Sequence, residues 1–213
     1  MILAALLLAT ATAIPAIDVI DDNGRVRSTS EWRGAPVILA PMYARCPLAC
    51  PLIARSLERG VAESTASPSS YRVVLFSFDP HDTVDDLRRF RDRQQIPLGW
   101  SIVRAVDDKD TRRLLDAVDY RFAVAGNFYT HPNAIIALTP DLRPARFIAG
   151  THYDIDAALA AARGGSDWIG RWGGWALAIL LFVGLMAGVY LMTALAKGST
   201  GEVRDRTLPT SRY

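Results

Sequence analysis

The stretch PVILAPMYARCPLACPLIARSLERGVAE, residues 36–63, sets out a strand, a pair of cysteines and a helix in close succession. Residues 36–43 are a short apolar run typical of a central buried strand, and Pro41 is expected to end or bend this strand. Residues 51–63 carry apolar side chains at helical spacing, and Pro51 suits the first turn of a helix. This order predicts a helix that starts directly after the cysteines.

The rest of the domain continues to alternate between strands and helices. Strands are predicted at residues 16–20, 25–28, 71–78, 100–106, 134–138 and 145–149, and helices at residues 83–94, 110–118 and 154–163. Asp21-Asp22-Asn23-Gly24 and Thr139-Pro140-Asp141 are turn sequences that indicate hairpins, and Thr83 is expected to cap its helix. The order predicts an α/β fold, a thioredoxin-like sandwich around a mixed β-sheet, over residues 17–168.

Cys46 and Cys50 are the two cysteines of the chain. Cys46 is expected in a loop and Cys50 near a helix N-terminus, where backbone N–H groups and the helix dipole favour thiolate. A disulfide across so short a loop restrains the unfolded chain little, which argues against a purely structural bridge. Two inert buried thiols are the other plain alternative. The pair indicates redox chemistry or binding of a soft metal, and by itself does not decide between them.

His131 is the candidate third ligand among three histidines. In a thioredoxin-like sheet, the loop entering the strand at residues 134–138 lies beside the cysteine loop. Two thiolates and an imidazole suit Cu(I) and leave a position open for Cu(II) or for a partner's ligand. A catalytic zinc site has similar ligands, but no well-placed general base accompanies them. His81 is expected to be a solvated turn residue and His152 to lie at the far end of the hairpin, and neither is expected to have a functional role.

Both ends of the chain are predicted to be membrane-directed. An apolar run ends at Ala11-Thr12-Ala13, a cleavage signature typical of a signal peptide. Near the other end, 22 residues carry no charge and match the thickness of a bilayer, and basic residues follow them. The predicted segments are a signal peptide at 1–16, a linker at 169–174, a transmembrane helix at 175–196 and a cytoplasmic tail at 197–213. The domain is therefore expected on the periplasmic side of the inner membrane, where disulfides can form.

The composition is that of an ordinary soluble domain and gives no indication of a nucleic-acid-binding protein. Half of the residues are apolar, enough for a buried core, and 22% are charged, which is ordinary for a soluble domain. The formal net charge is +2. Without a cluster of Lys and Arg, this charge gives no indication of nucleic-acid binding.

Across residues 17–163 the chain resembles the SCO/SenC family. The matching pieces are Asp22-Asn23-Gly24-Arg25, Trp32-Arg33-Gly34, Cys46 to Pro51 as CxxxCP, Ser77-Phe78-Asp79-Pro80 with Asp82-Thr83, and His131. The resemblance implies a thioredoxin-like domain that binds copper, as Cu(I) or Cu(II), through Cys46, Cys50 and His131. It also implies delivery of copper to the binuclear copper site of cytochrome c oxidase subunit II or a related copper oxidase, or reduction of that site's cysteines. Other copper carriers or thiol reductants would be further partners, and Asp79 matches an acidic position that orients the site or meets a partner.

The chain departs from the family pattern at three points. Leu48-Ala49 stands where members often carry an acidic residue, and Pro132 follows the histidine where serine is common. Pro132 leaves the isomer of the His131–Pro132 bond open. The third departure is the anchor, which is C-terminal here and usually N-terminal in the family.

The alternative to a copper chaperone is a thiol-disulfide oxidoreductase that uses the Cys46/Cys50 dithiol. One thiolate would attack a substrate disulfide and the other would resolve the mixed disulfide. The spacing is one residue wider than the common CxxC, which counts against this alternative. A peroxidase of the peroxiredoxin sort shares the fold, but no partner set around Cys46 matches its chemistry.

Overall fold

The computed structural model describes residues 12–126 and 128–164, together with Gly184 and Met186. Residues 12–164 belong to one compact unit, Met1–Gly165. Within these described ranges, no helix is long and apolar enough to cross a membrane. The predicted transmembrane helix, 175–196, lies outside the described residues apart from Gly184 and Met186, as do the predicted linker and tail and most of the predicted signal peptide.

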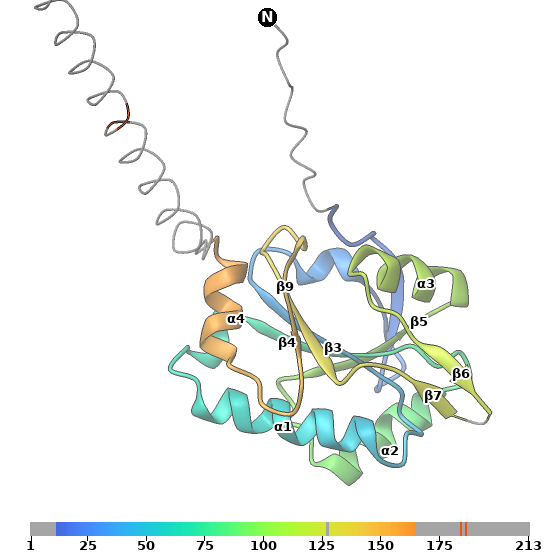
Figure 1. Cartoon of the computed structure of the whole chain (residues 1–213). Helices are drawn as coiled ribbons and strands as arrows, with labels where there is room; N and C mark the ends of the chain where they lie inside the picture. The colour runs from blue at the N-terminus through green and yellow to red at the C-terminus, as the bar shows by residue number, and fades with distance from the viewer. Residues whose placement is uncertain (1–11, 127, 165–183, 185, 187–213) are drawn as a thin grey trace, which may run out of the picture. The chain divides into compact units, whose positions relative to one another are not determined.

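A seven-stranded mixed sheet forms the centre of the domain, in the order β2-β1-β5-β4-β3-β8-β9 (Figure 1). Its strands are β1 (Asp18–Asp21), β2 (Val26–Ser28), β3 (Val37–Met42), β4 (Arg72–Ser77), β5 (Ser101–Ala105), β8 (Ala134–Leu138) and β9 (Pro144–Ala149). Strands β3, β4 and β5 run parallel, whereas the other neighbours pair antiparallel. The core strands β3 and β8 are buried along their whole length, which explains their unbroken apolar sequence.

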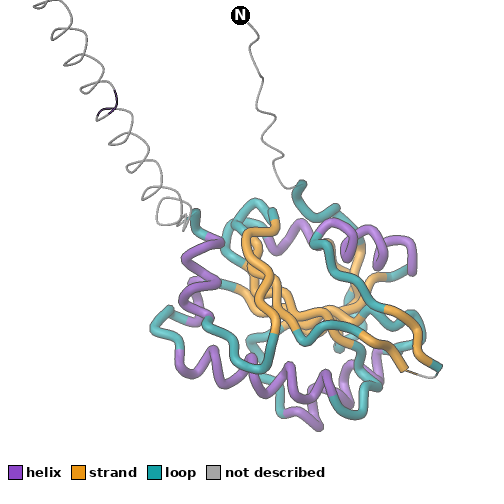
Figure 2. The backbone as a smooth tube through the Cα atoms, viewed as in Figure 1, coloured by secondary structure: helices purple, strands orange, loops and turns teal. Residues whose placement is uncertain are grey.

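Helices cover both faces of this sheet, so that the strands form an inner layer (Figure 2). The helices are α1 (Ala49–Glu63), α2 (Val84–Gln94), α3 (Asp108–Ala117) and α4 (Ile155–Ala162), with short 3-10 helices at Thr29–Trp32 and Pro68–Ser70. Helices α1 and α2 lie side by side on one face, and α3 lies over the other (Figure 1). The predicted α/β, thioredoxin-like fold with a mixed sheet is confirmed.

The packed domain begins upstream of residue 17. Ile14 is 2% exposed, and its N–H donates to the carbonyl of Leu142 at 2.9 Å. The carbonyl of Pro15 accepts the hydroxyl of Thr29. Residues within the segment predicted as a signal peptide, 1–16, therefore contribute to the core.

Two local features differ from the sequence predictions. Strand β3 does not end at Pro41 but continues to Met42, because pairing with β8 covers only Val37–Leu39 and leaves no ladder on that side for the proline to interrupt. A second, two-stranded sheet of β6 (Ala123–Ala125) and β7 (Phe128–Thr130) was not predicted. Its strands are short and mostly exposed, so they carry little apolar pattern, although Gly126-Asn127 is a hairpin-type dipeptide.

Helix α2 begins as predicted. The Thr83 hydroxyl accepts the N–H of Asp86, and the Asp86 carboxylate accepts the N–H of Thr83 in return, forming a capping box. This reciprocal cap holds the start of α2 directly behind the loop that carries Asp79 and Asp82.

Gly60 marks the closest approach of α1 to the chain before α4. A Cβ at this position would lie 2.3 Å from the carbonyl oxygen of Tyr153. Because the opposing atom belongs to the backbone, we expect Gly60→Ala to lower the free energy of unfolding by about 1–3 kcal/mol, despite the better helix propensity of alanine. Urea denaturation followed by circular dichroism measures this change.

Gly99→Ala is the matched control, since a Cβ there meets nothing within 4 Å. We expect it to change stability by less than about 0.5 kcal/mol. Equal stability of the two variants would contradict the close packing of α1.

Candidate metal centre

The three residues predicted as ligands come together at one end of the sheet. Cys46 lies in the loop after β3, Cys50 in the first turn of α1, and His131 between β7 and β8. Their ligand atoms all lie within 4.8 Å of one another. Because β3 and β8 are antiparallel neighbours, the end of one and the start of the other meet at the same edge.

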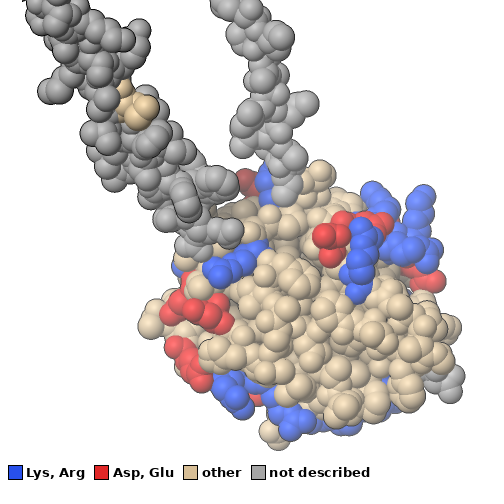
Figure 3. All heavy atoms as spheres, viewed as in Figure 1, with Lys and Arg blue, Asp and Glu red and all other residues tan. Residues whose placement is uncertain are grey.

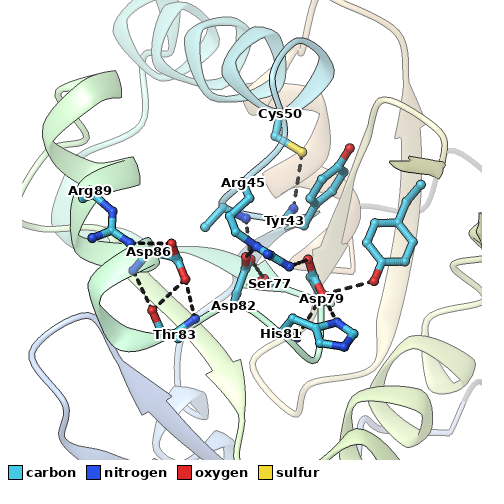
Figure 4. Close-up of polar contacts among 12 residues, drawn as sticks. Tyr43, Arg45, Cys50, Ser77, Asp79, His81, Asp82, Thr83, Asp86 and Arg89 are labelled. Atoms are coloured by element: carbon cyan, nitrogen blue, oxygen red, sulfur yellow. Dashed lines mark hydrogen bonds and ion pairs between the residues drawn. The ribbon is translucent and has the colours of Figure 1, made fainter. Parts of the chain in front are cut away.

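Backbone N–H groups hold both sulfurs in place. The N–H of Cys50 donates to the Cys46 Sγ at 3.2 Å. The N–H of Tyr43 donates to the Cys50 Sγ at 3.3 Å (Figure 4). The Cys50 Sγ lies 3.7 Å from the Nε2 of His131. Both thiols are free and buried, with Cys46 7% and Cys50 1% exposed.

The two thiols differ in acidity. A hydrogen bond from the Cys50 thiol, aided by His131 and by backbone N–H groups, lowers the pKa of Cys46 to about 3, although burial opposes the shift. Burial raises the pKa of Cys50, and the neighbouring Cys46 sulfur raises it further. The pair therefore holds one thiolate, at Cys46, and one proton, at Cys50.

Tyr120 fixes the orientation of the His131 ring. Its hydroxyl donates to the carbonyl of Pro132 at 2.9 Å and lies 3.0 Å from the His131 Nδ1. The carbonyl of Pro132 also lies 3.2 Å from the Nδ1, so that this nitrogen has two polar partners. Nδ1 is thereby tied to the protein, and Nε2 is the ring nitrogen that faces the Cys50 sulfur, where it can bind a metal.

Aromatic rings enclose the imidazole. The ring centroids of Tyr43 and Phe78 lie 5.8 and 5.3 Å from that of His131, each at a steep angle. Tyr129 packs edge-on against both rings. These rings exclude water from one side of the site, so that charges there are screened less than at an open surface.

A buried network of carboxylates anchors the cysteine loop (Figure 4). The Arg45 guanidinium bridges Asp79 at 2.6 Å and Asp82 at 3.1 Å. Asp82 also accepts the N–H of Ala44 at 2.5 Å, while Asp79 accepts the hydroxyl of Tyr129 at 3.0 Å. Both carboxylates are almost fully buried, at 3% and 2% exposure. Asp79, predicted to orient the site or meet a partner, is thus placed to orient the loops on either side of it.

The other two histidines stay outside the cluster. The His81 side chain is 75% exposed and contacts the Asp79 carboxylate, and His152 lies exposed in the loop before α4. The described residues contain no cis peptide bond, so the His131–Pro132 bond is trans.

Sequence reasoning missed Arg45, Asp82 and Tyr120 as members of the site. Asp82 was visible as part of the Asp-Pro motif, where its role was not assigned. Arg45 and Tyr120 act through partners far away in sequence, and no local pattern marks them.

Comparisons with known proteins give a family and close structural neighbours. The SCO1/SenC family model matches residues 9–96. A putative electron transfer protein from Aquifex aeolicus VF5 is 37% identical, covers 73% of this chain and 95% of its own, and has a TM-score of 0.69. No curated protein sequence matches the chain.

Two Sco structures share the fold at lower identity. ScoI from Bradyrhizobium japonicum, solved with copper bound, is 14% identical over 71% of this chain and 98% of its own, with a TM-score of 0.58. BsSco, described as a cytochrome c oxidase assembly protein with a disulfide switch, is 14% identical over 72% and 95%, with a TM-score of 0.59.

The different pKa values of the two thiols predict that the reduced, metal-free protein contains one thiolate. We expect the ultraviolet absorbance of a single thiolate to persist well below pH 8.5, about the pKa of a free cysteine, because the Cys50 donor holds the pKa of Cys46 down. Cys46→Ala should abolish this absorbance. Cys50→Ala removes the main donor and should raise the pKa of Cys46. Two thiolates that both titrate near pH 8.5, as in a free dithiol, would contradict the assignment.

Proposed function

Because the chain belongs to the SCO1/SenC family of thioredoxin-like proteins, we propose that it binds copper through Cys46, Cys50 and His131 and serves in cytochrome c oxidase assembly. The observation that carries this proposal is the convergence of two sulfurs and one imidazole nitrogen within 4.8 Å. Soft thiolate and imidazole ligands select Cu(I), and a fourth position stays open for an incoming ligand.

The chemistry of the three donors fits this cargo. Of the two thiols, Cys46 already offers a thiolate, so that only Cys50 has to lose its proton when the metal binds. The hydrogen bonds to Tyr120 and the aromatic walls hold the imidazole in place before a metal arrives. Copper bound by few ligands at such a site can pass stepwise to the thiolates of an acceptor.

The proposal extends to the acceptor and to the place of action. The acceptor is the binuclear copper site of cytochrome c oxidase subunit II, either as the recipient of copper or through reduction of its thiols. The uncharged run at 175–196 supports a single inner-membrane anchor, and the signal-like start and the basic tail support a periplasmic domain.

The different pKa values of the Cys46 and Cys50 thiols favour thiol-disulfide exchange as a second candidate function. A low pKa at Cys46 and a protonated Cys50 nearby are the properties of an attacking and a resolving cysteine. The putative electron transfer protein from Aquifex aeolicus VF5 carries a name of this kind. The two candidates differ in their need for His131, which a dithiol reductase does not require.

Titration with Cu(I) against a competing chelator tests the three-ligand site. We expect the reduced full chain, in neutral detergent, to bind one Cu(I) tightly, and His131→Ala to weaken binding at least tenfold, which is about 1.4 kcal/mol. His81→Ala and His152→Ala are matched controls, since both side chains lie outside the cluster, and they should keep the affinity of the unmodified protein. Unchanged affinity in His131→Ala would reject the three-ligand site and favour the oxidoreductase.

Tyr120→Phe tests the orientation of the imidazole. We expect Cu(I) affinity to fall by about tenfold, because the ring loses the hydroxyl that holds its Nδ1. Tyr71→Phe is the control, since the buried Tyr71 hydroxyl has no hydrogen-bond partner among the described residues. The same affinity in both variants would show that Tyr120 has no part in presenting His131.

A further inference from the structure

A cavity of about 520 Å³ opens beside Cys46. It lies between the cysteine loop, the first turns of α1 and the end of α2, and its lining includes Arg45, Arg55 and Arg93 as well as Cys46. The volume falls in the range of about 300–1,000 Å³ that is usual for small-molecule sites. Three cations and Cys46 therefore border the same space.

Two of these cations lack a carboxylate partner. Among the described residues, Arg55 and Arg93 make no ion pair, and their hydrogen bonds go to the carbonyls of Pro51 and Ala44. Arg45, in contrast, is held by Asp79 and Asp82. The cavity thus contains two guanidinium groups whose charge is not balanced by an ion pair.

The acidic side chain in the lining is already engaged. Asp86 pairs with Arg89 at 2.6 Å and accepts from Thr83 (Figure 4). The segment between the cysteines, Leu48-Ala49, adds no negative charge. In Figure 3, Lys and Arg atoms gather along the lower edge of the molecule, where Figure 1 places α1 and α2. The surroundings of this cavity therefore favour an anion.

We propose that the cavity binds a small thiol compound that carries carboxylate groups, with Arg55 and Arg93 holding the carboxylates and the compound's sulfur meeting Cys46. Guanidinium groups bind carboxylates through paired hydrogen bonds. A thiol is the ligand class that exchanges with a cysteine thiolate, whether the exchange passes copper or reducing equivalents. Binding of the compound does not depend on the proposed function, whereas the transfer of copper or of reducing equivalents that would follow rests on it.

Exchange with Cys46 needs no further oxidant when the compound arrives as its disulfide. The Cys46 thiolate attacks one sulfur, the S–S bond of the compound breaks, and a mixed disulfide with Cys46 forms. The second half of the compound leaves as a thiolate with the electron pair. An acidic protein segment is the other candidate occupant, but its carboxylates would leave Cys46, which borders the cavity, without a sulfur to react with.

The reaction of Cys46 with two disulfide reagents tests the cavity. Dithiobis(nitrobenzoate) carries two carboxylates, and dithiodipyridine is uncharged. In the reduced full chain, we expect the double variant Arg55→Gln/Arg93→Gln to react at least about fivefold more slowly with the anionic reagent. Its rate with the uncharged reagent should change less than about twofold, which excludes an effect on the thiolate itself.

Arg59→Gln is the matched control, because Arg59 lies exposed one turn further along α1 and outside the cavity lining. It should react like the unmodified protein with both reagents. Equal slowing by Arg59→Gln, or no slowing in the double variant, would overturn the proposal.

Protection by a bound compound identifies the occupant. Glutathione methylated on its sulfur should slow the reaction of the unmodified protein with dithiodipyridine, and the double variant should lose this protection. Stronger protection by a sulfur-free oligoglutamate peptide would assign the cavity to an acidic protein segment and overturn the proposal.

Cu(I) titration of the same proteins separates this proposal from the proposed function. The double variant should keep its Cu(I) affinity within about threefold, since neither arginine touches the three ligands. If the double variant is slowed only with the anionic reagent but the unmodified protein does not bind Cu(I) tightly, the copper function is rejected and the proposal for the cavity stands. If Cu(I) binds tightly but the double variant reacts like the unmodified protein with both reagents, the proposal for the cavity is rejected and the copper function stands.

Discussion

The antiparallel pairing of β3 with β8 is the constraint on which the site depends. Because the two strands run in opposite directions, β3 ends at the edge of the sheet where β8 begins, and residues 81 positions apart come within 3.7 Å. Each strand is buried on both faces, and a slip of one residue would exchange its two faces. The register that packs the core therefore also sets the distance between the sulfurs and the imidazole.

A second constraint acts on the loop itself. Arg45 forms ion pairs with two buried carboxylates, Asp79 and Asp82, and Asp82 also accepts the Ala44 N–H. Buried ion pairs of this kind often add little net stability, because desolvation opposes their attraction. Their value here is geometric, since they fix the backbone immediately before Cys46 and, through Tyr129, one wall of the histidine pocket.

The parts of this arrangement that local pattern determines could be predicted from the sequence. The apolar runs of β3, β4 and β8, the capping residue Thr83 and the turn after β1 all follow from short-range chemistry. The meeting of His131 with the cysteines followed from an expected topology. The β6–β7 hairpin and the path of β3 through Pro41 depend on which neighbours each strand has, and these neighbours are set by the whole fold. The roles of Arg45 and Tyr120 are hidden for the same reason, because their partners lie across the site and not along the chain.

The unequal protonation of the two cysteines has a consequence for capture of copper in acid surroundings. A site with two neutral thiols would release two protons for each metal ion, and its apparent affinity would fall about a hundredfold for each unit drop in pH. With Cys46 already deprotonated, only one thiol proton has to leave, so the thiols contribute about a tenfold fall per unit. The site would then keep more of its affinity for copper as the pH falls.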